Sequence, residues 1–376
     1  MRERFHGRIY ATPPTCEIAN IILKDAEHIM EDEYRREYRP KLYERTDVEG
    51  VSRLFHGLDY SRWVKVGDLR IRLRDAGHIF GSAFVEIEER GGPRIVFSGD
   101  VGNVDMPILR PTAQIAACDA LILESTYGNR IHEDERTRRT KLKQVLDQTI
   151  RRGGVLIIPA FAVERTQALL YELNALVENK EIPRVDVYLD SPMAIRVAEV
   201  IKSYPEYYDR EALRKVTEGD DLFQFPGLKL TESREQSKLI NDAPKPKVII
   251  AGAGMMNGGR ILHHLVRYLA DPKSTVLIIG YQSAGTLGRR LYSGERQVEV
   301  LNERIQVRAN VTSIGAFSAH ADQRKLITWI REAETRPKRV FCTHGEEATA
   351  AALASRLNEE LELTAEVPRF EQTVKL

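Results

Sequence analysis

The sequence predicts a mixed α/β protein in which a parallel α/β domain interrupts a mainly antiparallel one. Two hydrophobicity patterns lead to this prediction. Between residues 63 and 100, short segments alternate apolar and polar residues and are joined by short turns, as in an antiparallel sheet. From about Thr137 to Arg290, continuous apolar segments alternate with segments of helical length, as in a parallel sheet with helices on both faces.

The antiparallel part begins with four segments, "WVKVGD", "LRIRLRD", "AFVEIEE" and "RIVFSGD". In "LRIRLR" the apolar side chains are expected on one face, and Arg70, Arg72 and Arg74 on a second face that is in contact with water. In the parallel part we expect buried strands at "GVLIIPAF", "VDVYLD", "KVIIAGAG" and "TVLIIGY".

Helices are expected between these buried strands. Residues 164–178 carry leucines on one stripe, and a helix at 192–204 starts with Ser191 as its cap and Pro192 in its first turn.

After Arg290 the alternating pattern returns in "IQVRANV" and "RVFCTH", followed by a helix at 347–359 and a closing strand. The expected divisions are 1–136, 137–297 and 298–376, of which the first and last form one domain.

Composition excludes several classes of protein. Lys and Arg number 56 against 55 Asp and Glu, so a nucleic-acid partner would have to bind a local basic patch. Three widely spaced cysteines exclude a disulfide framework and fit a reducing compartment. There is no apolar run of membrane-spanning length and no signal-peptide start. We therefore expect a cytoplasmic protein without a membrane partner.

Metal-binding side chains follow three predicted strands. "RIVFSGDVGN" ends a strand at Asp100, "DAGHIFGSA" places His78 in a turn, and His344 follows the strand in "VFCTHGEE". Asp before Gly is ordinary turn chemistry when it occurs alone. Because strand ends of one sheet lie side by side, however, these three side chains can converge. Imidazole and carboxylate without thiolate suit a catalytic zinc or manganese site.

Two more residues strengthen this hypothesis. "SIGAFSAHAD" contains His320, and Glu124 ends the apolar segment in "LILESTYGNR". Glu124 alone would be an ordinary cap or salt-bridge partner. Cys342 shares a strand face with His344, but a buried thiol is the expected interpretation.

The chain resembles a known family through eight motifs in order: "DAGHIFGSA", "FSGDVGN", "LILESTYGNR", "PAFAVERTQ", "LDSPMA", "AGAGMMNGGRILHHL", "GAFSAHAD" and "CTHGEE". They resemble the metallo-β-lactamase-fold nucleases with a β-CASP insertion, especially RNA-processing enzymes related to the cleavage and polyadenylation endonuclease. The resemblance implies a metallo-β-lactamase αββα sandwich, incomplete at its N-terminus, that is interrupted by a parallel α/β β-CASP domain.

The resemblance also implies roles for the five residues. His78 is implied as a ligand of the first metal, Asp100 as the bridge between both metals, and His344 as a ligand of the second. His320 would act at the scissile phosphate, and Glu124 would orient it. The implied cofactors are two Zn²⁺, or Mn²⁺. The implied reaction is RNA hydrolysis to 5′-phosphate and 3′-hydroxyl ends, with endonuclease activity and 5′-exonuclease activity as an added mode.

One family motif, His-x-His-x-Asp-His, is absent from the 376 residues. "ERFHGRIYATPPT" resembles the segment that directly follows this motif. We therefore expect the motif, and the opening strands of one sheet, to be encoded upstream of Met1, and we expect the 376 residues alone to be inactive. The alternative is a shortened protein that has lost catalysis. The upstream reading frame tests this expectation.

RNA is the expected partner, in single-stranded form, and a homodimer remains open. Helix N-termini and glycine-rich turns present N–H groups to phosphates. The RNA-binding candidates on these grounds are Arg165, Ser191, Gly254, Arg260 and Arg289.

Several other residues are expected to be structural. His263 and His264 are expected at the surface or between domains, and Phe223, Phe225 and Tyr281 in the core. Two other functions stay open: a hydrolase of this fold acting on DNA or a small molecule, and a non-catalytic RNA-binding scaffold.

Overall fold

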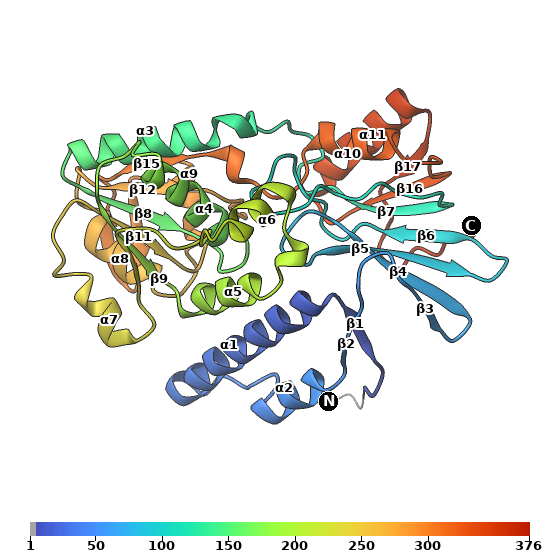
Figure 1. The fold of residues 1–376 in the computed structure, drawn as a ribbon, viewed down its shortest axis with the longest axis horizontal. Coiled ribbons are helices and arrows are strands. Elements are labelled where there is room, and N and C mark those ends of the chain that lie inside the picture. Colours follow the sequence, from blue (N-terminus) through green and yellow to red (C-terminus); the bar gives the residue numbers. More distant parts are fainter. Residues whose placement is uncertain (1–4) are drawn as a thin grey trace. The chain divides into compact units, whose positions relative to one another are not determined.

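The computed structural model describes residues 5–376, which form two compact units (Figure 1). The first unit combines the chain up to Ile131 with Ala319–Leu376, and the second is His132–Ser318. An α/β unit is thus inserted into another one, as the sequence predicts. Residues 298–318, which the sequence places in the last segment, lie in the second unit because one of their strands joins its sheet.

Within the described residues, the first unit contains a seven-stranded sheet of order β17-β16-β7-β6-β5-β4-β3. Its strands are β3 (Trp63–Val66), β4 (Leu69–Asp75), β5 (Ala83–Glu89), β6 (Arg94–Phe97), β7 (Ala120–Glu124), β16 (Arg339–Thr343) and β17 (Thr364–Glu366). The expected antiparallel pairing is confirmed from β3 to β6.

The other three strands pair in parallel: β7 with β6, β16 with β7, and β17 with β16. The prediction that "RVFCTH" forms an antiparallel strand is therefore wrong. The physical reason is connectivity: parallel neighbours need long crossovers, and the inserted second unit separates β7 from β16.

One face of this sheet packs against α10 (Gln323–Arg331) and α11 (Glu347–Leu361). Phe84, Leu121 and Trp329 belong to this core. The arginines of β4 lie on the same face, because Arg74 is the cross-strand partner of Phe84.

The sequence predicts that the arginine face of β4 is in contact with water, but part of this face is covered. Arg72 and Arg74 pair there with Glu86, which is fully buried.

The opposite face of the sheet is apolar and half exposed. Leu69 and Phe97 are 40% and 41% exposed, and their neighbours on this face, Ile71, Ile87 and Ile95, are only partly buried by the described residues. An apolar face of this extent is typical of a sheet that packs against a further layer.

A double substitution of Leu69 and Phe97 by threonine should lower binding of a hydrophobic dye such as ANS by about half. It should change the free energy of unfolding by less than about 1 kcal/mol, since partly exposed side chains contribute little. Leu121→Ala, in the covered core, is the matched control and should cost about 2–5 kcal/mol. Unchanged dye binding by the double variant would show that this face is covered.

The N-terminal elements support the turn that carries His78. They are α1 (Pro13–Glu37), α2 (Arg45–Ser52) and the parallel pair β1 (Ile9–Ala11) and β2 (Phe55–Gly57). Thr12 caps α1, and the hydroxyls of Thr12 and Thr15 donate to the Gly81 carbonyl at 2.7 and 2.8 Å.

The second unit contains, within the described residues, a six-stranded parallel sheet of order β10-β9-β11-β8-β12-β15. The strands are β8 (Val155–Pro159), β9 (Asp186–Asp190), β10 (Leu228–Leu230), β11 (Lys247–Ala251), β12 (Thr275–Ile278) and β15 (Asn310–Ser313). The four predicted buried strands are all present and pair in parallel.

Helices lie on both faces of this sheet, with α8 and α3 on opposite sides (Figure 1). The helices are α3 (Arg138–Arg151), α4 (Arg165–Glu178), α5 (Pro192–Lys202), α6 (Arg210–Thr217), α7 (Arg234–Leu239), α8 (Ile261–Tyr268) and α9 (Leu287–Tyr292). Strands β13 (Gln297–Val300) and β14 (Glu303–Gln306) form a separate antiparallel hairpin. Of the helices in residues 5–376, none combines the length and the apolar character needed to cross a bilayer.

Candidate metal centre

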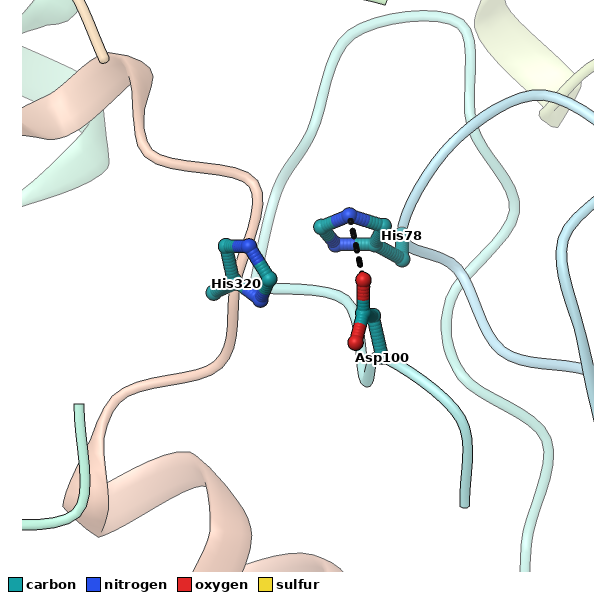
Figure 2. Close-up of side chains that lie close together, drawn as sticks. All are labelled: His78, Asp100 and His320. Atoms are coloured by element: carbon teal, nitrogen blue, oxygen red, sulfur yellow. Dashed lines mark ion pairs between the residues drawn. The ribbon is translucent and has the colours of Figure 1, made fainter. Parts of the chain in front are cut away.

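Five side chains predicted from the sequence lie together in the first unit. His78 follows β4, Asp100 follows β6, Glu124 ends β7, His344 follows β16, and His320 precedes α10. Figure 2 shows His78, Asp100 and His320 pointing toward one another.

A backbone feature brings two of these turns together. Gly102 lies so close to Gly77 that a Cβ on Gly102 would overlap the Gly77 carbonyl. The Gly102 N–H donates to the Ala76 carbonyl at 2.8 Å, and Gly102 also forms a β-bridge with His320. A glycine after Asp100 is therefore needed for the Asp100, His78 and His320 segments to meet.

The donors form two overlapping groups. Ligand atoms of His78, Asp100 and His320 lie within 4.8 Å of one another, as do those of Asp100, Glu124 and His344. His78 Nε2 lies 3.7 Å from Asp100 Oδ2 (Figure 2), while His344 Nδ1 lies 2.9 Å from Asp100 Oδ1. The two oxygens of one carboxylate thus face different histidines.

Glu124 holds the Nδ1 side of the His320 ring. Its side chain is buried, and its Oε2 lies 3.2 Å from His320 Nδ1. The Val101 N–H donates to the other oxygen, Oε1, which fixes the carboxylate. A carboxylate that accepts from Nδ1 sets the imidazole tautomer and leaves Nε2 for the site.

The donor chemistry fits zinc or manganese. Among residues 5–376, the grouped donors are imidazoles and carboxylates. Cys342 lies on β16, the strand that His344 follows, but it is fully buried, and burial raises the pKa of its thiol to about 12. The expectation of a buried core cysteine is confirmed. His344, with a side chain 61% exposed, opens the group to solvent.

The RNA-binding candidates all lie in the second unit. Ser191 caps α5, as predicted, with its Oγ accepting from the Ala194 N–H at 3.3 Å. Arg165 is buried and pairs with Glu164, and Arg289 is half buried in α9. The fifth candidate, Gly254, lies in the loop after β11.

Arg260 makes most of its contacts within the unit. Its guanidinium donates to Asp190 at 2.7 Å and to the carbonyls of Thr231 and Glu232 at 3.0 and 2.8 Å. These bonds use most of the donors of the Arg260 guanidinium, which leaves few for a phosphate. Its structural role is observed, and its contact with RNA stays a prediction.

His264 is not at the surface, and that expectation is wrong. Its ring is buried, and Nε2 lies 2.8 Å from Asp190 Oδ2, because His264 reaches from α8 to the last residue of β9. Exposed His263 agrees with the prediction, as do buried Phe223 and Phe225, while Tyr281 is half buried.

Two domain families match the chain. The Beta-Casp domain matches residues 166–291, and the Zn-dependent metallo-hydrolase RNA specificity domain matches residues 304–368. "Ribonuclease TTHA0252" from Thermus thermophilus is 36% identical over 356 residues, which cover 95% of this chain and 79% of that protein. The chain belongs to the β-CASP family of the metallo-β-lactamase fold.

Archaeal members of the β-CASP family are also similar. "Transcription termination factor FttA" from Pyrococcus horikoshii is 32% identical over 387 residues, and the protein of the same name from Methanosarcina mazei is 31% identical over 384. Each match covers 99% of this chain but only 58% and 59% of the archaeal proteins.

A crystal structure of a protein of unknown function from Enterococcus faecalis V583 has a TM-score of 0.51 at 11% identity. The match covers 96% of this chain and 74% of that one, and it supports the fold alone.

One exposed aromatic residue of the second unit, Phe161, is not among the site residues that the sequence predicts. Phe161 follows buried strand β8 within the quoted motif "PAFAVERTQ" and is 37% exposed. An aromatic residue directly after a buried strand was the available signal.

Proposed function

We propose that this chain is the RNA-binding and RNA-hydrolysing part of a zinc-dependent ribonuclease. The observation that carries the proposal is the placement of Asp100 between His78 and His344, beside the Glu124–His320 pair. The printed name of the Thermus relative and the RNA specificity domain support RNA as substrate. We propose single-stranded RNA and action in the cytoplasm, where the three free cysteines would stay reduced. A homodimer is compatible with this proposal.

Each residue has a distinct task in the proposed mechanism. His78, His344 and Asp100 would hold two zinc or manganese ions, which would activate a water for attack and neutralise phosphate charge. Asp100 could serve both positions because its two oxygens face different histidines. His320, when protonated, would donate a proton to the leaving 3′ oxygen or stabilise charge on the phosphate. Glu124 would hold the Nδ1 proton and keep Nε2 directed at the substrate.

We also propose that the 376 residues alone bind metal weakly and do not cleave RNA. If His320 acts on the substrate and Glu124 orients His320, the described residues leave each metal one histidine and a share of Asp100. Open catalytic zinc sites usually have three protein ligands. The His-x-His-x-Asp-His motif implied by the family resemblance would supply the rest.

The test compares residues 1–376 alone with the same chain carrying that motif segment from a family ribonuclease. We expect weak RNA binding by the first protein, falling steeply as salt rises because counterions are released. We expect cleavage of a labelled single-stranded RNA to 5′-phosphate ends by the second. Preference for DNA or a chromogenic ester would overturn the substrate assignment. Robust cleavage by residues 1–376 alone, with two bound metals, would overturn the ligand assignment.

The second candidate function is a non-catalytic RNA-binding scaffold, which the small number of donors favours. The same comparison separates the two. A scaffold would bind RNA in both forms and cleave it in neither, even with two ions bound.

A further inference from the structure

The ring of Phe161, in the second unit, packs against the backbone of two glycines, Gly254 and Gly280. A Cβ on Gly254 would lie 2.7 Å from Phe161 Cδ2, and a Cβ on Gly280 would lie 3.4 Å from Phe161 Cε2. A side chain on Gly254 would clash with the ring, whereas a Cβ on Gly280 would only touch it, so the close packing of Phe161 requires a glycine at position 254. Phe161 nevertheless remains 37% exposed, so the two glycine segments contact the ring without burying it.

Hydrogen bonds hold this arrangement rigid. Buried Gln282 donates through Nε2 to the carbonyls of Gly254 and Gly280, at 3.1 and 3.2 Å. The hydroxyl of Thr166 donates to the Phe161 carbonyl at 2.8 Å. The ring is thus presented by a fixed turn rather than by a mobile loop, and binding to it would cost little ordering entropy.

The position of Phe161 in the sheet is typical of a ligand site. Pro159, at the end of β8, is paired with Ala251, at the end of β11. From β8 the chain continues to β9 on one side, and from β11 it crosses to β12 on the other. In open α/β sheets, ligands bind outside the carboxyl ends of strands at such a switch in direction. Phe161 and Gly254 lie in the two loops that leave these ends.

The chemistry of this turn favours a flat, apolar group over a phosphate. A cation, Arg165, lies close to this turn, since its Nε would lie 3.9 Å from a Cβ on Gly280. Arg165 is buried and paired with Glu164, which is also buried, so its charge is offset. The accessible group is the aromatic ring.

We propose that Phe161 is a stacking platform for one base of the bound RNA. This inference rests on the proposed function and adds a contact that recognises a base rather than the backbone. Aromatic stacking accepts any base, because every base presents a π-face. The platform would therefore strengthen binding of single-stranded RNA without imposing a sequence.

The test measures the affinity of the 376-residue chain for a short single-stranded RNA and for an abasic strand of equal length. Phe161→Ala should weaken binding of the RNA about tenfold and leave binding of the abasic strand unchanged. Phe161→Trp should restore affinity. Tyr292→Ala, which removes another exposed aromatic ring of this unit, is the matched control and should change neither. Thermal unfolding of each variant checks the fold.

The outcomes separate this inference from the proposed function. If the unaltered chain binds no RNA, the proposed function fails and the platform with it. If RNA binds and Phe161→Ala has no effect, the platform alone is overturned. An equal loss on the abasic strand would also overturn it, because such a loss would come from backbone contacts.

Discussion

Asp100→Ala is expected to abolish binding of the two proposed metal ions and to remove RNA cleavage in the chain that carries the His-x-His-x-Asp-His segment. Of the described residues, Asp100 alone belongs to both donor groups, and its two oxygens face His78 and His344. Glu124→Gln should cost about 10–100-fold in activity, the usual loss for a residue that acts through a neighbour. Its geometry places it behind His320 rather than between the histidines.

The measurements are metal content after dialysis and turnover of a labelled RNA. Asp68→Ala, which removes an exposed carboxylate from the turn between β3 and β4, is the matched control and should leave both quantities unchanged. Comparable turnover losses for the Asp100 and Glu124 variants, with two ions retained in both, would contradict the assigned roles.

The convergence of the candidate site could be predicted because it depends on local rules. His78, Asp100, Glu124 and His344 each follow or end a strand of one sheet, and the ends of neighbouring strands lie side by side. His320 instead comes from the segment before α10. The sequence could not show which oxygen of Asp100 faces which histidine. That detail depends on the close approach of Gly102 to Gly77, between segments that are distant in sequence.

The failures of prediction concern long-range pairing. The segment at β16 alternates weakly and was assigned to an antiparallel sheet, but strand direction depends on what the chain does between β7 and β16. The alternation of arginines in β4 correctly predicts a strand. It cannot show that Arg72 and Arg74 pair with the buried Glu86 of the next strand, which places them on the covered face. The expectation that His264 lies at the surface or between domains failed because its partner, Asp190, is remote in sequence, and the sequence does not show their contact.

Asp190→Ala is expected to destabilise the second unit by about 3 kcal/mol, the lower end of the range for breaking a buried ion pair. Asp190 is fully buried, and its carboxylate accepts from Arg260, His264, Ser237 and Thr231. Removing it leaves buried donors without this acceptor. The loss is held to the lower end because Arg260 still donates to two backbone carbonyls.

The same network predicts a dependence on pH. Burial raises the pKa of Asp190, but the hydrogen bonds from its four partners outweigh this effect and lower the pKa to about 2. A carboxyl whose pKa is lower in the folded than in the unfolded state stabilises the fold above its unfolded pKa, near 4, and this stability is lost as pH falls toward 2. The contribution of roughly 2 kcal/mol should therefore be present at pH 7 and disappear between about pH 4 and 2, and it should be absent from Asp190→Ala.

Denaturant unfolding at pH 7 and at pH 3 measures both effects. Asp186→Ala is the matched control, because Asp186 begins the same strand and pairs with Lys229 at 2.7 Å, but with side chains 35% and 47% exposed. Such an exposed pair contributes at most about 1 kcal/mol. Equal losses at pH 7 for the two variants would mean that the buried network stabilises the sheet no more than a surface ion pair does. In that case His264 and Arg260 would have to satisfy their donors elsewhere once Asp190 is removed.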